Sequence, residues 1–308
     1  MNEITIIAPI TAVILLGQLL GRTGMVSPHT FRENNKILYW LAIPALLLRL
    51  TARANLDALG GWNLFLAVYG SYFLLPFIAW LSGKIGKEKP QRIAISVLTS
   101  IRSNQVFMGI PAISIAMGVE GLEAMSLFLA MSLVGYHVLS ITASQFVLSG
   151  GLSLRGVAGT FWKVVQNPMV CACLVGICFS YFEIHQFPRW IDVTLKVLGD
   201  IGTGLALLAL GASIRVASAR GLLRATWRDC FFKLFLHPAV IYLLFLVFPV
   251  EKTMLQVVVF ASALPVAVNS LVVAQGMGMD SGYAGELIAV STILSVFTLP
   301  LWMRFLGI

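Results

Sequence analysis

The feature that most constrains this chain is the scarcity of charged side chains within its long apolar stretches. Lys and Arg together number 21 and Asp and Glu 13 among 308 residues, which is 11% of the chain, against about 25% in a typical soluble domain. The hydrophobic fraction of 58% and the mean hydropathy of +0.91 leave more apolar surface than a soluble globule of this size could cover with polar residues. We therefore expect an all-α integral membrane protein whose partner is the lipid bilayer.

The net charge of +8 does not indicate a nucleic-acid partner, because the basic residues stand in short clusters between uncharged stretches. Clusters of this kind indicate which loops of a membrane protein lie on the cytoplasmic side. The four cysteines lie in apolar runs, without the convergent thiolates or imidazoles that a zinc site needs. We expect them to be packing residues, and we expect no metal and no cofactor.

The chain divides into ten stretches long enough to cross a bilayer core of about 30 Å, which takes roughly 20 apolar residues per helix. Its connections are short, the longest lying near 149–167, so no soluble domain is inserted. The ten expected spans are 4–20, 37–52, 62–82, 93–117, 122–148, 168–184, 190–213, 230–248, 254–276 and 282–303.

The distribution of Lys and Arg predicts the orientation of these spans. Thirteen of them fall in alternate loops, at 21–36, 83–92, 149–167 and 214–229, and only four fall on the opposite side. Cytoplasmic loops carry the excess of positive charge. We therefore expect both termini outside the cytoplasm, with the chain in a plasma membrane, the inner membrane of a bacterium.

A weak internal repeat divides the ten spans into two groups of five. Residues 37–48 match 197–208 at an offset of 160, and Ser103-Asn104 match Pro265-Val266 at an offset of 162. An odd number of spans per half forces the halves into opposite orientations, the architecture of alternating-access carriers. We expect a first repeat at 1–148, a cytoplasmic linker at 149–167 and an inverted second repeat at 168–308.

The fourth and ninth spans are interrupted at corresponding places. The fourth carries five polar residues and one Arg near the membrane midplane, and the ninth carries a proline that cannot donate a backbone hydrogen bond. Backbone N–H and C=O groups that lose their partners at such breaks must form hydrogen bonds with protein, water or substrate. The N-termini of half-helices attract anions. The candidate substrate-binding residues are Arg102, Ser103, Asn104, Gln105, Pro265, Val266 and Asn269.

Arg102 favours an organic acid as the substrate, because a guanidinium pairs with a carboxylate and a charge at mid-membrane needs water, a partner or a ligand. Two alternatives stay open. Arg102 could turn toward a carboxylate of the protein, and the amides of Asn104, Gln105 and Asn269 could simply join helices.

Other polar residues of the spans are weaker candidates for coupling, and each has an equally good structural explanation. Lys196 and Asp200 are four residues apart and can neutralise each other, His137 suits a hydrogen-bonded packing role, and Glu286 can reach the interface. Four further side chains lie near enough to span ends to extend toward the interface: Arg49, His185, Lys233 and His237.

Several segments together resemble the auxin efflux carrier family, which includes the plant PIN-FORMED carriers and many bacterial permeases. The resemblance covers nearly the whole chain, although each motif is short. The similar segments are 17–22 with 43–47, Asn104 with 107–111, 205–212, 263–265 and 291–300.

The resemblance implies an NhaA-like fold in which helices 4 and 9 cross at their breaks. It also implies a scaffold of helices 1, 2, 6 and 7, a mobile part of helices 3–5 and 8–10, an elevator-type movement and a homodimer through the scaffold. The family's substrates are small organic anions, such as auxin, malate or malonate, and its binding residues correspond to Asn104 and the Pro265 region. Two departures stand out, since Ser103 replaces a proline of the plant carriers and the large cytoplasmic loop is reduced to 149–167.

We therefore expect a secondary transporter of small organic anions and not an enzyme. One alternative is a sodium-coupled carrier of the bile-acid type, which would need several oxygen ligands at the crossing. Others are a membrane enzyme, for which buried Asp pairs and His clusters are lacking, or a receptor. The sequence leaves open the substrate, the direction of transport and the coupling ion.

Overall fold

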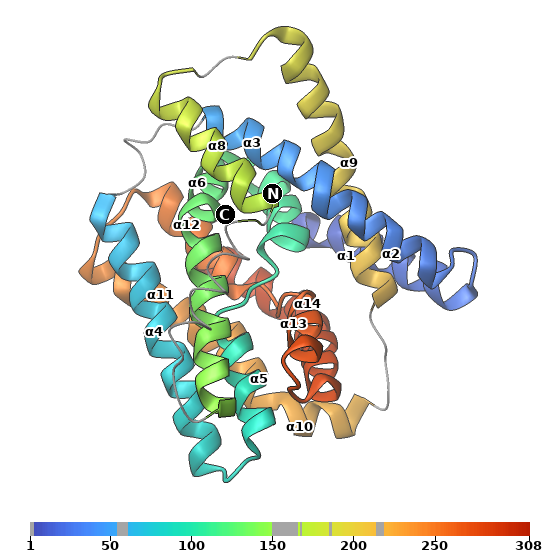
Figure 1. The fold of residues 1–308 in the computed structure, drawn as a ribbon, viewed down its shortest axis with the longest axis vertical. Coiled ribbons are helices and arrows are strands. Elements are labelled where there is room, and N and C mark those ends of the chain that lie inside the picture. The colour runs from blue at the N-terminus through green and yellow to red at the C-terminus, as the bar shows by residue number, and fades with distance from the viewer. Residues whose placement is uncertain (1–2, 54–60, 150–165, 167, 185–186, 214–218) are drawn as a thin grey trace.

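The computed structural model describes residues 3–53, 61–149, 166, 168–184, 187–213 and 219–308, and this part of the chain is almost entirely helical (Figure 1). Helices predominate because lipid offers the backbone no hydrogen-bond partners, so each apolar segment must satisfy its own N–H and C=O groups. Strand-like pairing within the described residues is limited to one isolated bridge between Ser103 and Val266.

The described residues of the first half form eight helical elements. They are α1 (Glu3–Thr23), α2 (Pro28–Ile37), the π-helix η1 (Leu38–Ala42), α3 (Ile43–Arg53), α4 (Gly61–Ile85), α5 (Pro90–Ser100), the π-helix η3 (Gln105–Gly109) and α6 (Ile110–Ser149).

The second half is similarly helical. Its elements are α8 (Pro168–Tyr181), α9 (Arg189–Ser213), α10 (Ala219–Phe231), the π-helix η4 (Phe232–Leu236), α11 (His237–Val247), α12 (Lys252–Ala263), α13 (Ser270–Gly276) and α14 (Ser281–Leu306).

Four segments of the described chain are long and apolar enough to cross a membrane: Gly61–Ile85, Gln105–Leu148, Leu223–Val247 and Ser281–Leu306. Large apolar side chains such as Phe73, Phe297 and Leu301 are exposed on them, as a lipid-facing surface requires. Helices also occupy the other ranges expected to span, but that they cross the bilayer, that the spans number ten and that the halves form an inverted repeat stay predictions.

The segment Gln105–Leu148 is divided at Gly118. A straight helix of this length would measure about 65 Å, roughly twice the bilayer core. Gly118 has φ +63° and ψ −143°, a backbone conformation that residues with a Cβ rarely adopt. The glycine therefore separates two helices, within the interval where the sequence predicts the fourth span to end and the fifth to begin.

The helices pack in two groups, and in Figure 1 α3, α8 and α9 lie in the upper part of the molecule and α5, α10, α13 and α14 in the lower part. In one group α1 packs against α9, and α3 packs against both α8 and α9. In the other, α5 packs against α4 and α6, α12 packs against α6, α11 and α14, and α10 packs against α14. The breaks of both interrupted helices therefore lie in elements of the second group.

Two glycines allow α1 and α9 to touch backbone to backbone. A Cβ built on Gly17 would overlap the carbonyl oxygen of Leu208, and one built on Gly211 would overlap the carbonyl oxygen of Ile14. Close approach at small residues is a general means of helix association in membranes. These two glycines therefore fix the spacing of α1 and α9.

Replacing Gly211 by alanine is expected to cost about 1–3 kcal/mol of stability, because the methyl group meets rigid backbone and the two helices must separate. Gly204→Ala in the same helix is the matched control, since a Cβ there meets nothing within 4 Å. It should be neutral or slightly stabilising, because alanine favours a helix over glycine. Thermal unfolding of the detergent-purified protein measures both, and equal midpoints for the two variants would contradict the proposed contact.

Candidate functional site

The structure interrupts two helices at the places where the sequence predicts the breaks. The first break follows Ser100, the last residue of α5, and ends where η3 begins at Gln105. The second follows Ala263, the last residue of α12, and ends where α13 begins at Ser270. Each break therefore leaves backbone groups without a partner in their own helix.

The two breaks cross and satisfy part of each other's backbone. The N–H of Asn104 donates to the carbonyl of Pro265 at 2.8 Å, and the N–H of Ala267 donates to the carbonyl of Arg102 at 2.9 Å. The N–H of Val266 donates to the hydroxyl oxygen of Ser291 in α14 at 3.2 Å. Four of the predicted site residues, Arg102 with Asn104 and Pro265 with Val266, thus come together at one point, which we call the crossing (residues 101–104 and 264–269).

Arg102 lies at the crossing with no exposed surface. Its guanidinium donates to the hydroxyl of Ser270 at 3.3 Å, the hydroxyl of Ser140 at 3.2 Å and the amide oxygen of Asn269 at 3.0 Å. Its Cζ lies 5.1 Å from the centre of the Tyr136 ring. All these partners are neutral. None of the described carboxylates lies within 4.0 Å of the Arg102 guanidinium, the limit for an ion pair. The described residues therefore do not show Arg102 turned toward a carboxylate of the protein.

Lys233 contacts the crossing through Ser103, a place that the sequence did not predict. We expected Lys233 and His237 to extend toward the interface, whereas both are buried, Lys233 completely. The ammonium group lies 2.6 Å from the hydroxyl of Ser103, 2.6 Å from the carbonyl oxygen of Ser262 and 3.0 Å from Nδ1 of His237. The available signal was a lysine inside an apolar run with a histidine four residues later, since intramembrane ionisable residues are functional candidates by default.

Buried polar atoms without a partner gather beside the crossing. The amide nitrogen of Asn104, both polar atoms of the Gln105 side chain and the hydroxyls of Tyr72 and Ser132 have no hydrogen-bond partner among the described residues. Tyr72 lies next to both Ser132 and Gln105. A buried polar atom left unpaired costs about 1–3 kcal/mol. The amide nitrogen of Asn104 therefore retains free capacity for a ligand, whereas the Gln105 side chain has the Tyr72 hydroxyl close beside it.

A family comparison decides the class of the protein. The model of a family described as membrane transport protein matches residues 3–150 and 154–303. The chain belongs to the auxin efflux carrier family. Together with the apolar helices, this membership makes it a multi-pass protein of a membrane transport family.

Several relatives are similar to the chain over nearly its full length. A protein of Rhizobium meliloti named "Putative malonate transporter" is 21% identical over 97% of this chain and 94% of its own. The uncharacterized transporter YfdV of Escherichia coli is 23% identical over 96% and 95%. An uncharacterized transporter of Methanothermobacter thermautotrophicus is 22% identical over 98% of each chain.

The four weaker coupling candidates each have a structural setting of their own. Lys196 and Asp200 form the expected pair at 2.7 Å, but both side chains are more than half exposed. Nδ1 of His137 lies 2.9 Å from the carbonyl of Leu133, which fits the packing role. Glu286 is partly exposed in the second turn of α14. None of the described His, Cys, Asp or Glu side chains groups in threes to hold a metal ion.

Arg49 has a carboxylate partner near the end of its helix, and its expected reach toward the interface stays a prediction. It pairs with Asp192 of α9 at 2.8 Å, and Arg53 pairs with the same carboxylate at 2.6 Å. The pairs fasten α3 to α9. His185, the remaining residue of that set, lies outside the described residues.

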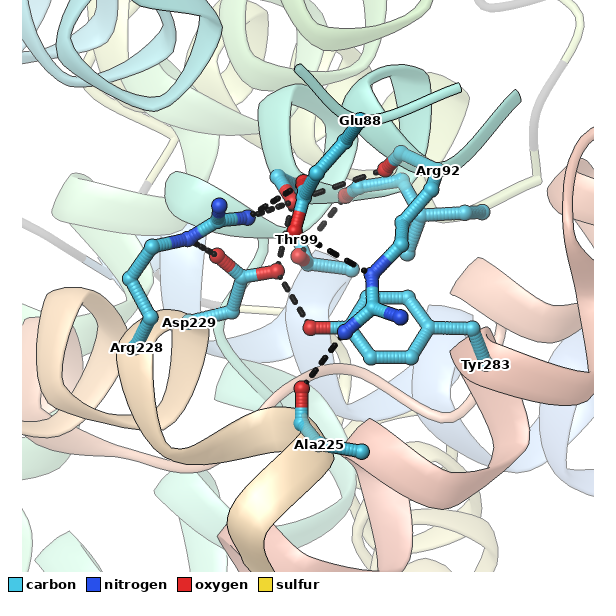
Figure 2. A network of polar contacts seen from close by, with 9 residues as sticks. Glu88, Arg92, Thr99, Ala225, Arg228, Asp229 and Tyr283 are labelled. Atoms are coloured by element: carbon cyan, nitrogen blue, oxygen red, sulfur yellow. Dashed lines mark hydrogen bonds and ion pairs between the residues drawn. The ribbon is translucent and has the colours of Figure 1, made fainter. Parts of the chain in front are cut away.

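A second polar cluster joins α5, α10 and α14 away from the crossing (Figure 2). The buried carboxylate of Asp229 accepts from Nε of Arg228 at 2.9 Å and from the hydroxyl of Tyr283 at 2.7 Å. Arg228 also pairs with Glu88 at 3.0 Å, and Figure 2 shows the Arg92 guanidinium over the Tyr283 ring, 4.1 Å from its centre. From the sequence, Arg92 and Arg228 are predicted only as positive charges of loops. No pattern in the neighbouring residues indicates that three helices share the Asp229 carboxylate.

Proposed function

We propose that the chain is a secondary transporter of small organic anions, carboxylates such as malate, malonate or auxin-like acids. The observation that carries the proposal is Arg102, a fully buried guanidinium at the crossing whose described partners are all neutral. A buried charge without a counter-charge is strongly unfavourable. A carboxylate substrate supplies that counter-charge.

The surroundings of Arg102 suit a small carboxylate. A guanidinium can present two parallel N–H groups to a carboxylate, and the unpartnered amide nitrogen of Asn104 adds a neutral donor. Gln105 also opens the long helical segment Gln105–Leu148, and the N-terminal end of a helix favours an anion. The relative named for malonate belongs to the same substrate class.

The packing supports an elevator-type mechanism of alternating access. We propose that α1, α3, α8 and α9 form the scaffold, through which two copies form a homodimer, and that the group holding the crossing moves against it. Arg102 and most of the crossing are buried in this arrangement, so we infer that a substrate reaches Arg102 only when the groups move. The reciprocal hydrogen bonds between the two breaks support an inverted repeat of residues 1–148 and 168–308.

The charge distribution supports an inner-membrane protein with both termini outside the cytoplasm. Two of the basic loops, 83–92 and 214–229, meet in space, since Arg228 pairs with Glu88. They therefore lie on the same side of the membrane, as the positive-inside rule requires if both are cytoplasmic.

Uptake by purified protein in liposomes tests the function. We expect saturable uptake of at least one labelled mono- or dicarboxylate, competed by unlabelled analogues and absent from protein-free liposomes. Proton and sodium gradients are imposed separately, which distinguishes this carrier from a sodium-coupled symporter of the bile-acid type. A response to cations or sugars with none to any carboxylate would refute the proposal.

A further inference from the structure

The ammonium group of Lys233 is held by three partners from three different parts of the fold. They are the hydroxyl oxygen of Ser103 in the first break, the carbonyl oxygen of Ser262 in α12 and Nδ1 of His237 one helical turn away. A protonated lysine has three N–H donors and no acceptor. The partners therefore match a charged ammonium in number, with Nδ1 of His237 as the acceptor tautomer.

No described carboxylate pairs with Lys233, and the negative partial charge that its ammonium group faces comes from the end of a helix. Ser262 lies in the last turn of α12, which ends at Ala263. The last carbonyls of a helix have no partner within it and carry its partial negative charge. The ammonium group thus lies at the negative end of the half-helix that precedes the second break, and its contact with Ser103 connects this end to the first break.

We propose that Lys233 is a built-in cation of the crossing, which holds the two breaks together in place of a mobile coupling cation. Hydroxyl and carbonyl oxygens are the ligands that a sodium ion would need at such a site, and here they are bound to an ammonium group that the chain itself carries. Lys233 is a positioning residue. Its described partners take up all three of its N–H donors, whereas those of Arg102 take up three of five and leave two N–H groups for the substrate. The consequence is that transport does not require sodium.

The stability of the purified protein tests the proposal without any substrate, and so independently of the proposed function. In detergent, exchange of sodium for choline should leave the unfolding midpoint of the unmodified protein unchanged. Lys233→Ala should lower the midpoint by about 5 °C or more, and ammonium or sodium ions should restore part of the loss. The unfolding midpoint of Lys233→Met should also be lowered. Added ammonium or sodium ions should not restore it, because the Met side chain fills the space that the ion would occupy. Lys252→Ala, at an exposed position in the first turn of α12, is the control that should respond to neither change.

Transport in liposomes supplies the second measurement, which rests on the proposed function. Carboxylate uptake by the unmodified protein should be equal within about twofold with and without sodium. Lys233→Ala should lose at least about tenfold and regain uptake with ammonium or sodium. Sodium-dependent uptake by the unmodified protein would overturn the proposal even if Lys233→Ala fails to fold. A Lys233→Ala variant of normal stability would also overturn the proposal. The same holds for a Lys233→Ala variant whose stability and uptake no small cation restores.

Discussion

Replacement of Arg102 by alanine should raise the apparent KM for the carboxylate substrate about 100-fold, which corresponds to about 2.7 kcal/mol of lost binding. The physical reason is that the guanidinium is buried with neutral partners only, so its charge is compensated by the substrate. Charge-assisted hydrogen bonds in such an environment are roughly twice as strong as neutral ones. Concentration-dependent uptake in liposomes measures the change.

Two further variants separate the charge of Arg102 from its shape. Arg102→Lys keeps the charge but loses the two-pronged geometry, and we expect an intermediate KM. Arg304→Ala removes an exposed arginine from the last turn of α14 and should leave KM unchanged. If Arg102→Ala inserts and folds normally, as judged by its unfolding midpoint, and retains the original KM, then Arg102 does not bind the substrate.

Replacement of Asp229 by alanine should lower the stability of the protein by about 3–5 kcal/mol, the usual cost of removing one partner from a buried ion pair. Asp229 is buried and accepts hydrogen bonds from Arg228, Ser96 and Tyr283. Its loss leaves Arg228 with Glu88 as its only carboxylate partner among the described residues and removes the acceptor that Ser96 of α5 and Tyr283 of α14 share. The unfolding midpoint in detergent measures the effect.

Tyr283→Phe is the graded control for this cluster. It removes the hydroxyl that donates to Asp229 but keeps the ring under the Arg92 guanidinium. The expected loss of stability is therefore only about 1 kcal/mol. Asp280→Ala, at the exposed N-cap of α14, should cost a similar amount through loss of the cap. A midpoint for Asp229→Ala no lower than those of these two variants would show that the cluster does not hold the three helices together.

The sequence was sufficient to predict the membrane class, the family and the two breaks. Hydropathy and charge are sums over consecutive residues, so they identify helices such as α4 and α14 without tertiary information. Pro265 and the polar run after Ser100 interrupt a helix for local reasons as well, because each disturbs backbone hydrogen bonding within one turn.

The sequence alone did not predict the partners of the buried charges. Helical spacing relates residues three or four apart, which was enough for the pair Lys196–Asp200. Lys233 and Ser103, by contrast, are 130 residues apart, and nothing in either segment identifies the other.

By itself, then, the sequence determined that the chain is a helical membrane protein of a transport family with two interrupted helices. Only the tertiary structure decided that the breaks cross through paired backbone hydrogen bonds, that Lys233 is buried between them and that Arg102 has only neutral described partners. The physical reason is that the position of a charge in a membrane protein depends on which distant oxygens the packed helices bring within hydrogen-bond reach, whereas hydropathy depends only on the residues nearby in the chain.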